Sequence, residues 1–230
     1  MQQKKKTVIM KKVIVSDEIR KVCPEFVGAA VEASVVNTEM DEGLWQEIHA
    51  LDAELQATHT TDDIKRISAI AATRKVYKAL GKDPSRYRPS GEQLMRRILQ
   101  GKGLYQINTL VDLVNLASLR YGYSIGGFDE CKICGSEVVL GVGRKDEPYE
   151  GIGRGILNIE GMPVYRDDIG GFGTPTSDNE RTKLSLNTTR LLCFVNGYDG
   201  NRADVEATAN MIVKLVEKYC QSTDAKYELI

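Results

Sequence analysis

The stretch Leu94–Asp129 reads LMRRILQGKGLYQINTLVDLVNLASLRYGYSIGGFD and decides the fold. Its first part has apolar residues at helical spacing, with Leu94 and Ile98 on the inward face. Gly101 is placed to end this helix, because glycine accepts the left-handed backbone that closes a helix. A second helix is predicted from about 109 to 121, with Gly122 as its stop.

Before this stretch the pattern of apolar residues changes from that of strands to that of helices. Alternating residues predict strands over 8–15 and 27–36, and the second strand places Val27, Ala29, Val31, Ala33 and Val35 on one face. From about Asp41 the apolar residues step by three and four, which is typical of an amphipathic helix.

Two more helix starts are predicted before the central stretch. One helix should begin at Thr60 or Thr61 and stop at Gly81. Ser90 followed by Gln93 three residues later predicts a capping box, in which hydroxyl and amide side chains satisfy free backbone groups.

After Gly122 the chain becomes glycine-rich and strand-like, and one helix closes it. The expected strands cover 138–140, 156–159, 162–166 and 191–195, and the helix covers about 203–220. Helices that gather early and strands that gather late predict an α+β fold rather than alternating βαβ units.

Composition excludes several classes of protein. The 230 residues are 42% hydrophobic and 27% charged, which excludes a disordered or fibrous chain. The 31 basic and 32 acidic residues exclude a globally basic nucleic-acid protein. Lys11 and Lys12 interrupt the first apolar run, so we expect no export signal or membrane span, and a cytoplasmic protein.

Positive charge is concentrated in one segment. Between Lys65 and Arg120 the chain has twelve basic and three acidic residues, a net charge of +9. Local positive density of this kind binds phosphate backbones through counterion release. The alternative is a set of solvated helix faces balanced by acids elsewhere in the fold.

Motifs for metals and cofactors are weak, and we expect neither a metal nor a cofactor. His49 and His59 are ten residues apart and would not share a helix face. Cys131 and Cys134 form a single C-x-x-C pair, whereas a zinc ribbon needs a second pair. The glycines of 151–155 precede a predicted strand instead of the helix that a phosphate loop requires.

A polar loop follows Asp167 and Asp168. Residues 170–181 read GGFGTPTSDNER, in which small residues expose backbone amides beside hydroxyls and carboxylates. Such a surface suits recognition of an amino group or sugar hydroxyl, or positioning of a water molecule. Equally, the Asp and Ser side chains could cap their own backbone.

The central stretch resembles the B3/B4 domain, the editing domain in the β-subunit of phenylalanyl-tRNA synthetase. The resemblance rests on Ile107-Asn108, Val111-Asp112, Asn115 and Phe128-Asp129, which stand at the family's spacings over about 36 positions. The chain has no room for a synthetase catalytic core, so it resembles a free-standing relative of the editing domain. The resemblance implies an α+β fold with a strand-rich sandwich flanked by helices and a central pocket.

In that family the pocket hydrolyses tyrosine wrongly attached to the phenylalanine tRNA. The family's pocket histidine falls on Gly126, which cannot bind a side chain or a water as imidazole does. The resemblance therefore leaves open whether this chain edits tyrosine. The pair Gly126 and Gly127 could instead admit a larger ligand or bring backbone amides close to one.

The domain hypothesis is a single B3/B4-like domain over 1–230, with 1–84 as an appended part, 85–200 as the best match to the family core and 201–230 as a C-terminal helix.

Two functional hypotheses follow. The first is a protein that binds tRNA or aminoacyl-tRNA and acts as an editing-like deacylase or its degenerate relative, with no catalytic residue assigned. The second is a module that binds an amino acid or nucleoside-like compound without RNA or catalysis. The pocket candidates are Asn115, Gly126, Gly127, Asp129, Asp168, Thr176, Ser177 and Asp178, and the RNA-binding candidates are Arg86, Arg88, Arg96 and Arg97.

Overall fold

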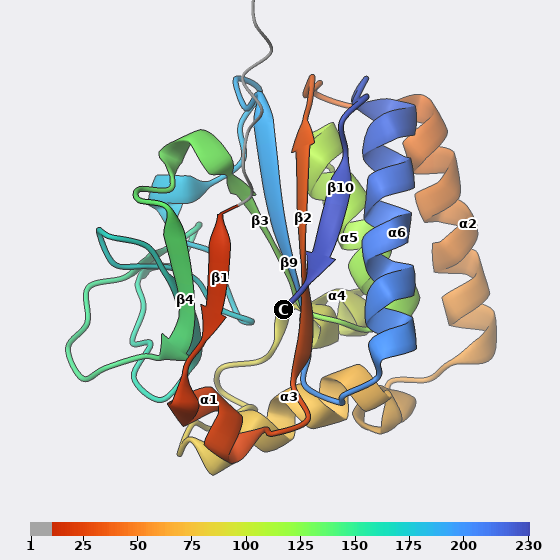
Figure 1. Ribbon diagram of the computed structural model, residues 1–230. Helices are drawn as coiled ribbons and strands as arrows, with labels where there is room; N and C mark the ends of the chain where they lie inside the picture. Colours follow the sequence, from red (N-terminus) through yellow and green to blue (C-terminus); the bar gives the residue numbers. More distant parts are fainter. Residues whose placement is uncertain (1–10) are drawn as a thin grey trace, which may run out of the picture.

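The computed structural model describes residues 11–230 and arranges them in three layers (Figure 1). Two four-stranded sheets pack face to face, and a layer of helices covers the outer face of one of them. This confirms the predicted α+β fold with a strand-rich sandwich flanked by helices.

The central sheet has the strand order β10-β2-β9-β3. It consists of β2 (Val27–Ser34), β3 (Ile125–Asp129), β9 (Arg190–Gly197) and β10 (Lys226–Leu229), all paired antiparallel. β2 lies between β9 and β10, with Ala30 opposite Phe194. The first strand of this sheet is therefore paired with strands from the far end of the chain.

The second sheet has the order β1-β4-β7-β8. It consists of β1 (Lys12–Val15), β4 (Glu137–Val142), β7 (Pro163–Arg166) and β8 (Gly171–Gly173). β1 and β4 run parallel, and the other pairs run antiparallel. A separate two-stranded ribbon joins β5 (Glu150–Gly151) and β6 (Gly155–Ile156).

The helices occupy the outer layer and one end of the sandwich (Figure 1). They are α1 (Asp17–Val22), α2 (Glu42–Thr58), α3 (Ser68–Ala79), α4 (Ser90–Leu99), α5 (Thr109–Tyr121) and α6 (Arg202–Tyr219), with short 3₁₀ turns η1 (Asp63–Arg66), η2 (Glu130–Lys132) and η3 (Glu180–Thr182). In Figure 1, α6 and α2 lie on one side of the central sheet, and β1 and β4 lie on the other.

Strand alternation divides the interior into two main cores. On β9, Cys193 and Val195 face the helices, whereas Leu192 and Phe194 face the second sheet. The face predicted for 27–36 is confirmed, because Ala29, Val31, Ala33 and Val35 are buried in the helix-side core and Val27 packs against it. Aromatic rings fill the core between the sheets, with Tyr165 stacked on Phe194 at 4.2 Å between ring centroids.

Several predicted boundaries were wrong, each for a local reason. The helix expected from Thr60 begins at Ser68, because Asp63 accepts hydrogen bonds from the amide and hydroxyl of Thr60 and a 3₁₀ turn forms there. The capping box at Ser90 is absent, since Pro89 holds the cap position without a side-chain hydrogen bond. The strand expected over 156–159 shrinks to the ribbon residues of β6.

The N-terminal strand expected over 8–15 is described from residue 11 on, and its earlier part lies outside the described residues. Strands β3, β5, β8 and β10 and helix α1 were not predicted. The domain boundary at residue 84 remains a prediction, although β1 and β2 pair with strands formed by later residues. Within residues 11–230, no helix is both long and apolar enough to cross a bilayer.

Candidate functional site

A hollow of about 360 Å³ opens beside α4, and we call it the arginine hollow. It is lined by Arg88, Gln93, Leu94, Arg96, Arg97, Gln100, Lys102 and Tyr105, which include four cations and no acid. The Nε atoms of Arg96 and Arg97 are buried without a hydrogen-bond partner, whereas Arg88 Nε lies 3.4 Å from Glu92. The side chains of Arg88 and Arg96 remain 39% and 27% exposed, so an anion can approach their guanidinium groups from the hollow.

Glu92 forms ion pairs with three arginine side chains. Its side chain is buried within α4, and its carboxylate lies 2.7 Å from Arg74, 3.2 Å from Arg96 and 3.4 Å from Arg88. One carboxylate therefore faces three guanidinium groups, which leaves a net positive charge at this place. The ion pairs also fix the arginine side chains and reduce the entropy lost when an anion binds.

The end of α4 brings Tyr105 against Arg97. The amide of Gly101 donates to the carbonyl of Ile98, and the amide of Lys102 donates to that of Arg97, with Gly101 at φ +68°. This is a Schellman motif, and it confirms Gly101 as the helix stop. The returning chain places the Lys102 carbonyl 3.2 Å from Arg97 Nη2 and the Tyr105 ring centroid 3.5 Å from the guanidinium carbon.

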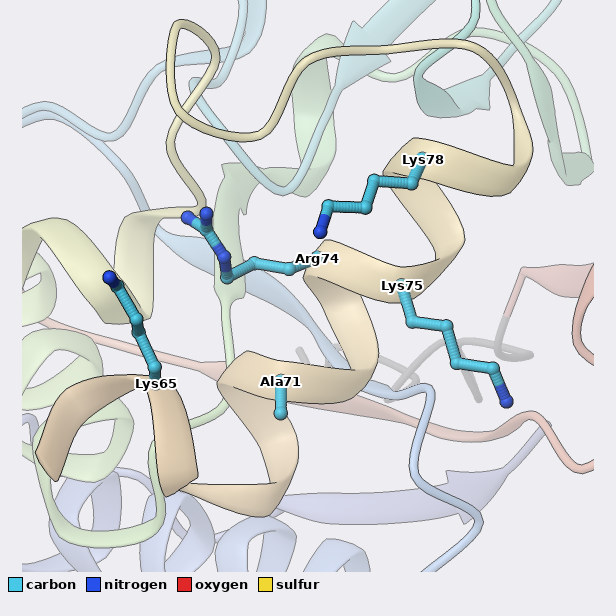
Figure 2. Close-up of a pocket in the computed structure, with 5 residues that line it drawn as sticks. All are labelled: Lys65, Ala71, Arg74, Lys75 and Lys78. Carbon is cyan, nitrogen blue, oxygen red and sulfur yellow. The ribbon is translucent and has the colours of Figure 1, made fainter.

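A second hollow of about 450 Å³ lies along α3 and η1, and we call it the lysine hollow. It is lined by Lys65, Ala71, Arg74, Lys75 and Lys78 (Figure 2). In Figure 2, Lys65 and Arg74 point toward the same space, whereas the ammonium group of Lys75 points away from it. Arg74 also binds Glu92, so this one side chain connects the two cationic hollows.

Gln93 connects the arginine hollow to the polar loop. Its amide nitrogen donates to the carbonyls of Arg88 at 2.7 Å and Thr176 at 3.3 Å. Its amide oxygen accepts from Arg154 at 2.6 Å. The loop that contains Thr176, Ser177 and Asp178 is thereby held against the beginning of α4.

Three of the predicted pocket residues meet at Asp178. One carboxyl oxygen accepts from the Gly127 amide at 3.3 Å, and the other lies 3.2 Å from where a Cβ on Gly126 would stand. Although part of the residue reaches the surface, burial of the carboxyl raises the pKa of Asp178 from 3.8 to about 8. A carboxyl group with this pKa is largely protonated near neutral pH and can exchange a proton there.

The space expected at the two glycines is already filled. A Cβ on Gly126 would stand 2.5 Å from the Phe128 ring, which also lies 2.5 Å from the corresponding position on Gly173. Phe128 is fully buried and packs edge-to-face on Phe172 at 4.9 Å. The expectation that Gly126 admits a larger ligand is therefore wrong, because an aromatic core residue needs this glycine.

Other predicted pocket residues have structural partners. The Thr176 hydroxyl contacts the Tyr77 hydroxyl at 2.8 Å, and Ser177 donates weakly to the Asp178 carbonyl. Asp129 accepts from Thr188 and from the Cys131 amide, which caps η2. Asp168 is exposed and lies over Gly135, where it belongs to a different loop cluster.

Two further predicted residues lie at the edge of these groups. Asn115 is half-buried on α5, next to Val114, whose side chain faces Gly127. Arg86 does not join the arginine hollow but lines another surface depression with Lys82 and Tyr87. The structure thus brings Arg88, Arg96 and Arg97 together and leaves Arg86 apart.

Sequence reasoning missed Glu92, Gln93 and Tyr105 as parts of the site. The i,i+4 spacing of Glu92 to both Arg88 and Arg96 was a usable signal. Tyr105 follows a predicted helix stop by four residues and carried no pattern of its own. Within residues 11–230, no three His, Cys, Asp or Glu side chains gather as metal ligands.

The B3/4 domain family model matches residues 72–221, which is more than half of the chain. The chain belongs to the B3/4 domain family. The resemblance seen in Leu94–Asp129 is thereby confirmed. A search of curated proteins gives no match for this B3/4 domain chain.

Among solved structures, one match is an N-terminal fragment of the phenylalanyl-tRNA synthetase beta-subunit from Pyrococcus horikoshii. Its TM-score is 0.48 at 15% sequence identity, and the match covers 96% of this chain and 52% of that one. The B3/4 domain chain therefore spans about half the length of this fragment.

Proposed function

We propose that this B3/4 domain chain binds the aminoacylated end of a tRNA. The observation that carries the proposal is the arginine hollow, which is lined by Arg88, Arg96, Arg97 and Lys102 and by no acid. Phosphate oxygens match these donors in charge and geometry, because a guanidinium presents N–H groups in a fixed fork. Membership of the B3/4 domain family, together with the resemblance of the central stretch to the editing domain of phenylalanyl-tRNA synthetase, agrees with a tRNA as the partner.

The polar loop would then meet the attached amino acid. Gln93 joins the wall of the arginine hollow to this loop, so a nucleotide bound at the arginines would lie beside it. In deacylation, a water attacks the ester carbonyl carbon, the C–O bond to the ribose breaks, and a free amino acid and a tRNA hydroxyl result. Asp178 is the candidate to accept the proton of that water in its ionised form, which is the minority form at neutral pH because burial raises the pKa of this carboxyl to about 8.

Binding is tested with one tRNA, both charged and uncharged, at 50 to 200 mM salt. The variant Arg96→Ala with Arg97→Ala should bind more weakly, and its slope of log affinity against log salt should fall by about 2. Arg202→Ala is the matched control, because this arginine lies on α6 in an exposed pair with Glu206. Equal affinity of wild type and double variant would remove the arginine hollow from the proposal.

Deacylation is tested separately with a panel of mischarged tRNAs. Release of the amino acid should exceed the rate in buffer and fall in Asp178→Asn. Release no faster than in buffer would exclude hydrolysis but leave binding in place. Salt-insensitive binding of a free amino acid without tRNA would instead favour the small-molecule module.

A further inference from the structure

Tyr105 has one covered face and one open face. The Arg97 guanidinium lies over the ring at 3.5 Å, whereas 65% of the residue is exposed. Neighbouring Ile107 is anchored through its amide, which donates to Asp112 at 3.1 Å. The ring is thus held by a cation on one side and presented to solvent on the other.

The Tyr105 ring lies beside arginine side chains, and this position suggests which ligand it binds. Tyr105 lines the same hollow as Arg88, Arg96 and Arg97. An anion held by Arg96 or Arg97 would therefore have an aromatic surface beside it. A nucleotide is a ligand that carries a phosphate and a flat base at neighbouring positions, and bases stack on aromatic rings with little regard to sequence.

We propose that Tyr105 is a stacking platform for an unpaired RNA base whose phosphate occupies the arginine hollow. This deepens the proposed function and rests on it, because it assumes that the arginines bind RNA. Base pairs in a duplex are stacked on one another and cannot lie on Tyr105, so the site selects single-stranded RNA. The partner is thus the unpaired end of an RNA, in preference to its double-stranded stem.

A polymer suits the surroundings better than a free nucleotide. Arg74 pairs with Glu92 and also lines the lysine hollow. Lys65 and Lys78 add further cations to that second hollow. A mononucleotide has phosphate for one hollow only, whereas an RNA chain has phosphates for both. Multiple phosphate contacts also add up in affinity.

The test measures binding of a labelled single-stranded oligoadenylate and of a blunt RNA duplex to the full chain. Tyr105→Ala should weaken binding of the single strand about 5- to 150-fold and leave duplex binding unchanged. Tyr105→Phe is the matched control and should bind the single strand within about twofold of wild type, because it keeps the ring. The exposed position of Tyr105 makes both variants safe for folding.

Three outcomes would overturn the proposal in different ways. If Tyr105→Ala binds like wild type while Arg96→Ala with Arg97→Ala loses binding, the platform is refuted and the proposed function stands. If wild type binds neither the oligonucleotide nor tRNA, both are refuted. If free adenosine monophosphate binds in a Tyr105-dependent way and RNA does not bind, the site serves a small nucleotide and the RNA assignment is wrong.

Discussion

Burial favours the neutral form of the Asp178 carboxyl group. Its pKa of about 8 in the folded chain compares with 3.8 for an ordinary aspartate. As pH rises from 4 to 8, the unfolded chain releases this proton first, so the contribution of Asp178 to folding stability falls over that range. At neutral pH the buried Asp178 carboxyl therefore lowers the free energy of unfolding. Perturbed carboxyl groups of this kind are common at functional sites.

Replacement of Asp178 by asparagine should remove this pH dependence. Asparagine keeps an oxygen for the Gly127 amide but carries no charge at any pH. We expect the stability of the variant relative to wild type to increase from pH 5 to pH 9, measured by urea unfolding at each pH. A difference that stays constant over this range would mean that the Asp178 carboxyl is not perturbed.

The substitution Gly126→Ala should destabilise the chain by about 1–3 kcal/mol, because the new Cβ would meet the buried Phe128 ring. Denaturant unfolding measures the loss. Phe128→Leu in the same chain is the control, since a smaller side chain should relieve the clash and make the double variant less destabilised than the sum of the single ones. Additive losses would contradict the contact.

At the scale of the element, α4 is a helix organised around one buried carboxylate. Glu92 faces Arg74, Arg88 and Arg96, which come from α3, from the chain before α4, and from α4 itself. The carboxylate satisfies these arginines in the absence of a ligand. It also competes with any anion that approaches them.

Glu92→Gln should therefore have two opposite effects. Loss of the buried charge should lower the free energy of unfolding by about 1.5–3 kcal/mol, because charge-assisted hydrogen bonds are lost. At the same time inorganic phosphate should raise the melting temperature of the variant more than that of wild type, since the arginines then lack their internal anion. An equal phosphate effect in both would show that Glu92 does not compete with the ligand.

Helices were more predictable than strands at this scale. Helical spacing and glycine stops identified α2, α4, α5 and α6 from local sequence. Strand β3, with the sequence IGGFD, has two glycines in place of alternating side chains, and only its pairing with β9 reveals it as a strand. The arginine cluster was predictable in part, but Tyr105 joins it through the Schellman turn, which sequence spacing does not locate in space.

At the scale of the whole molecule, the two cationic hollows lie on consecutive segments and share the Arg74–Glu92 contact. Lys65→Ala with Lys78→Ala should weaken RNA binding and lower the salt slope by about 2 if both contact phosphate. Arg202→Ala with Lys218→Ala is the control, because it removes the same number of charges from exposed ion pairs on α6 that line neither hollow. If the double variant leaves the salt slope unchanged, RNA contacts the arginine hollow and not the lysine hollow.

The placement of β2 has a consequence for biosynthesis. β2 is synthesised well before its partners β9 and β10. Until those partners emerge from the ribosome, both hydrogen-bonding edges of β2 lie open, and pairing requires the closure of a very long loop. The nascent chain therefore completes its central sheet only after β10 has been made, and chaperones that shield unpaired strands would raise the yield of native protein.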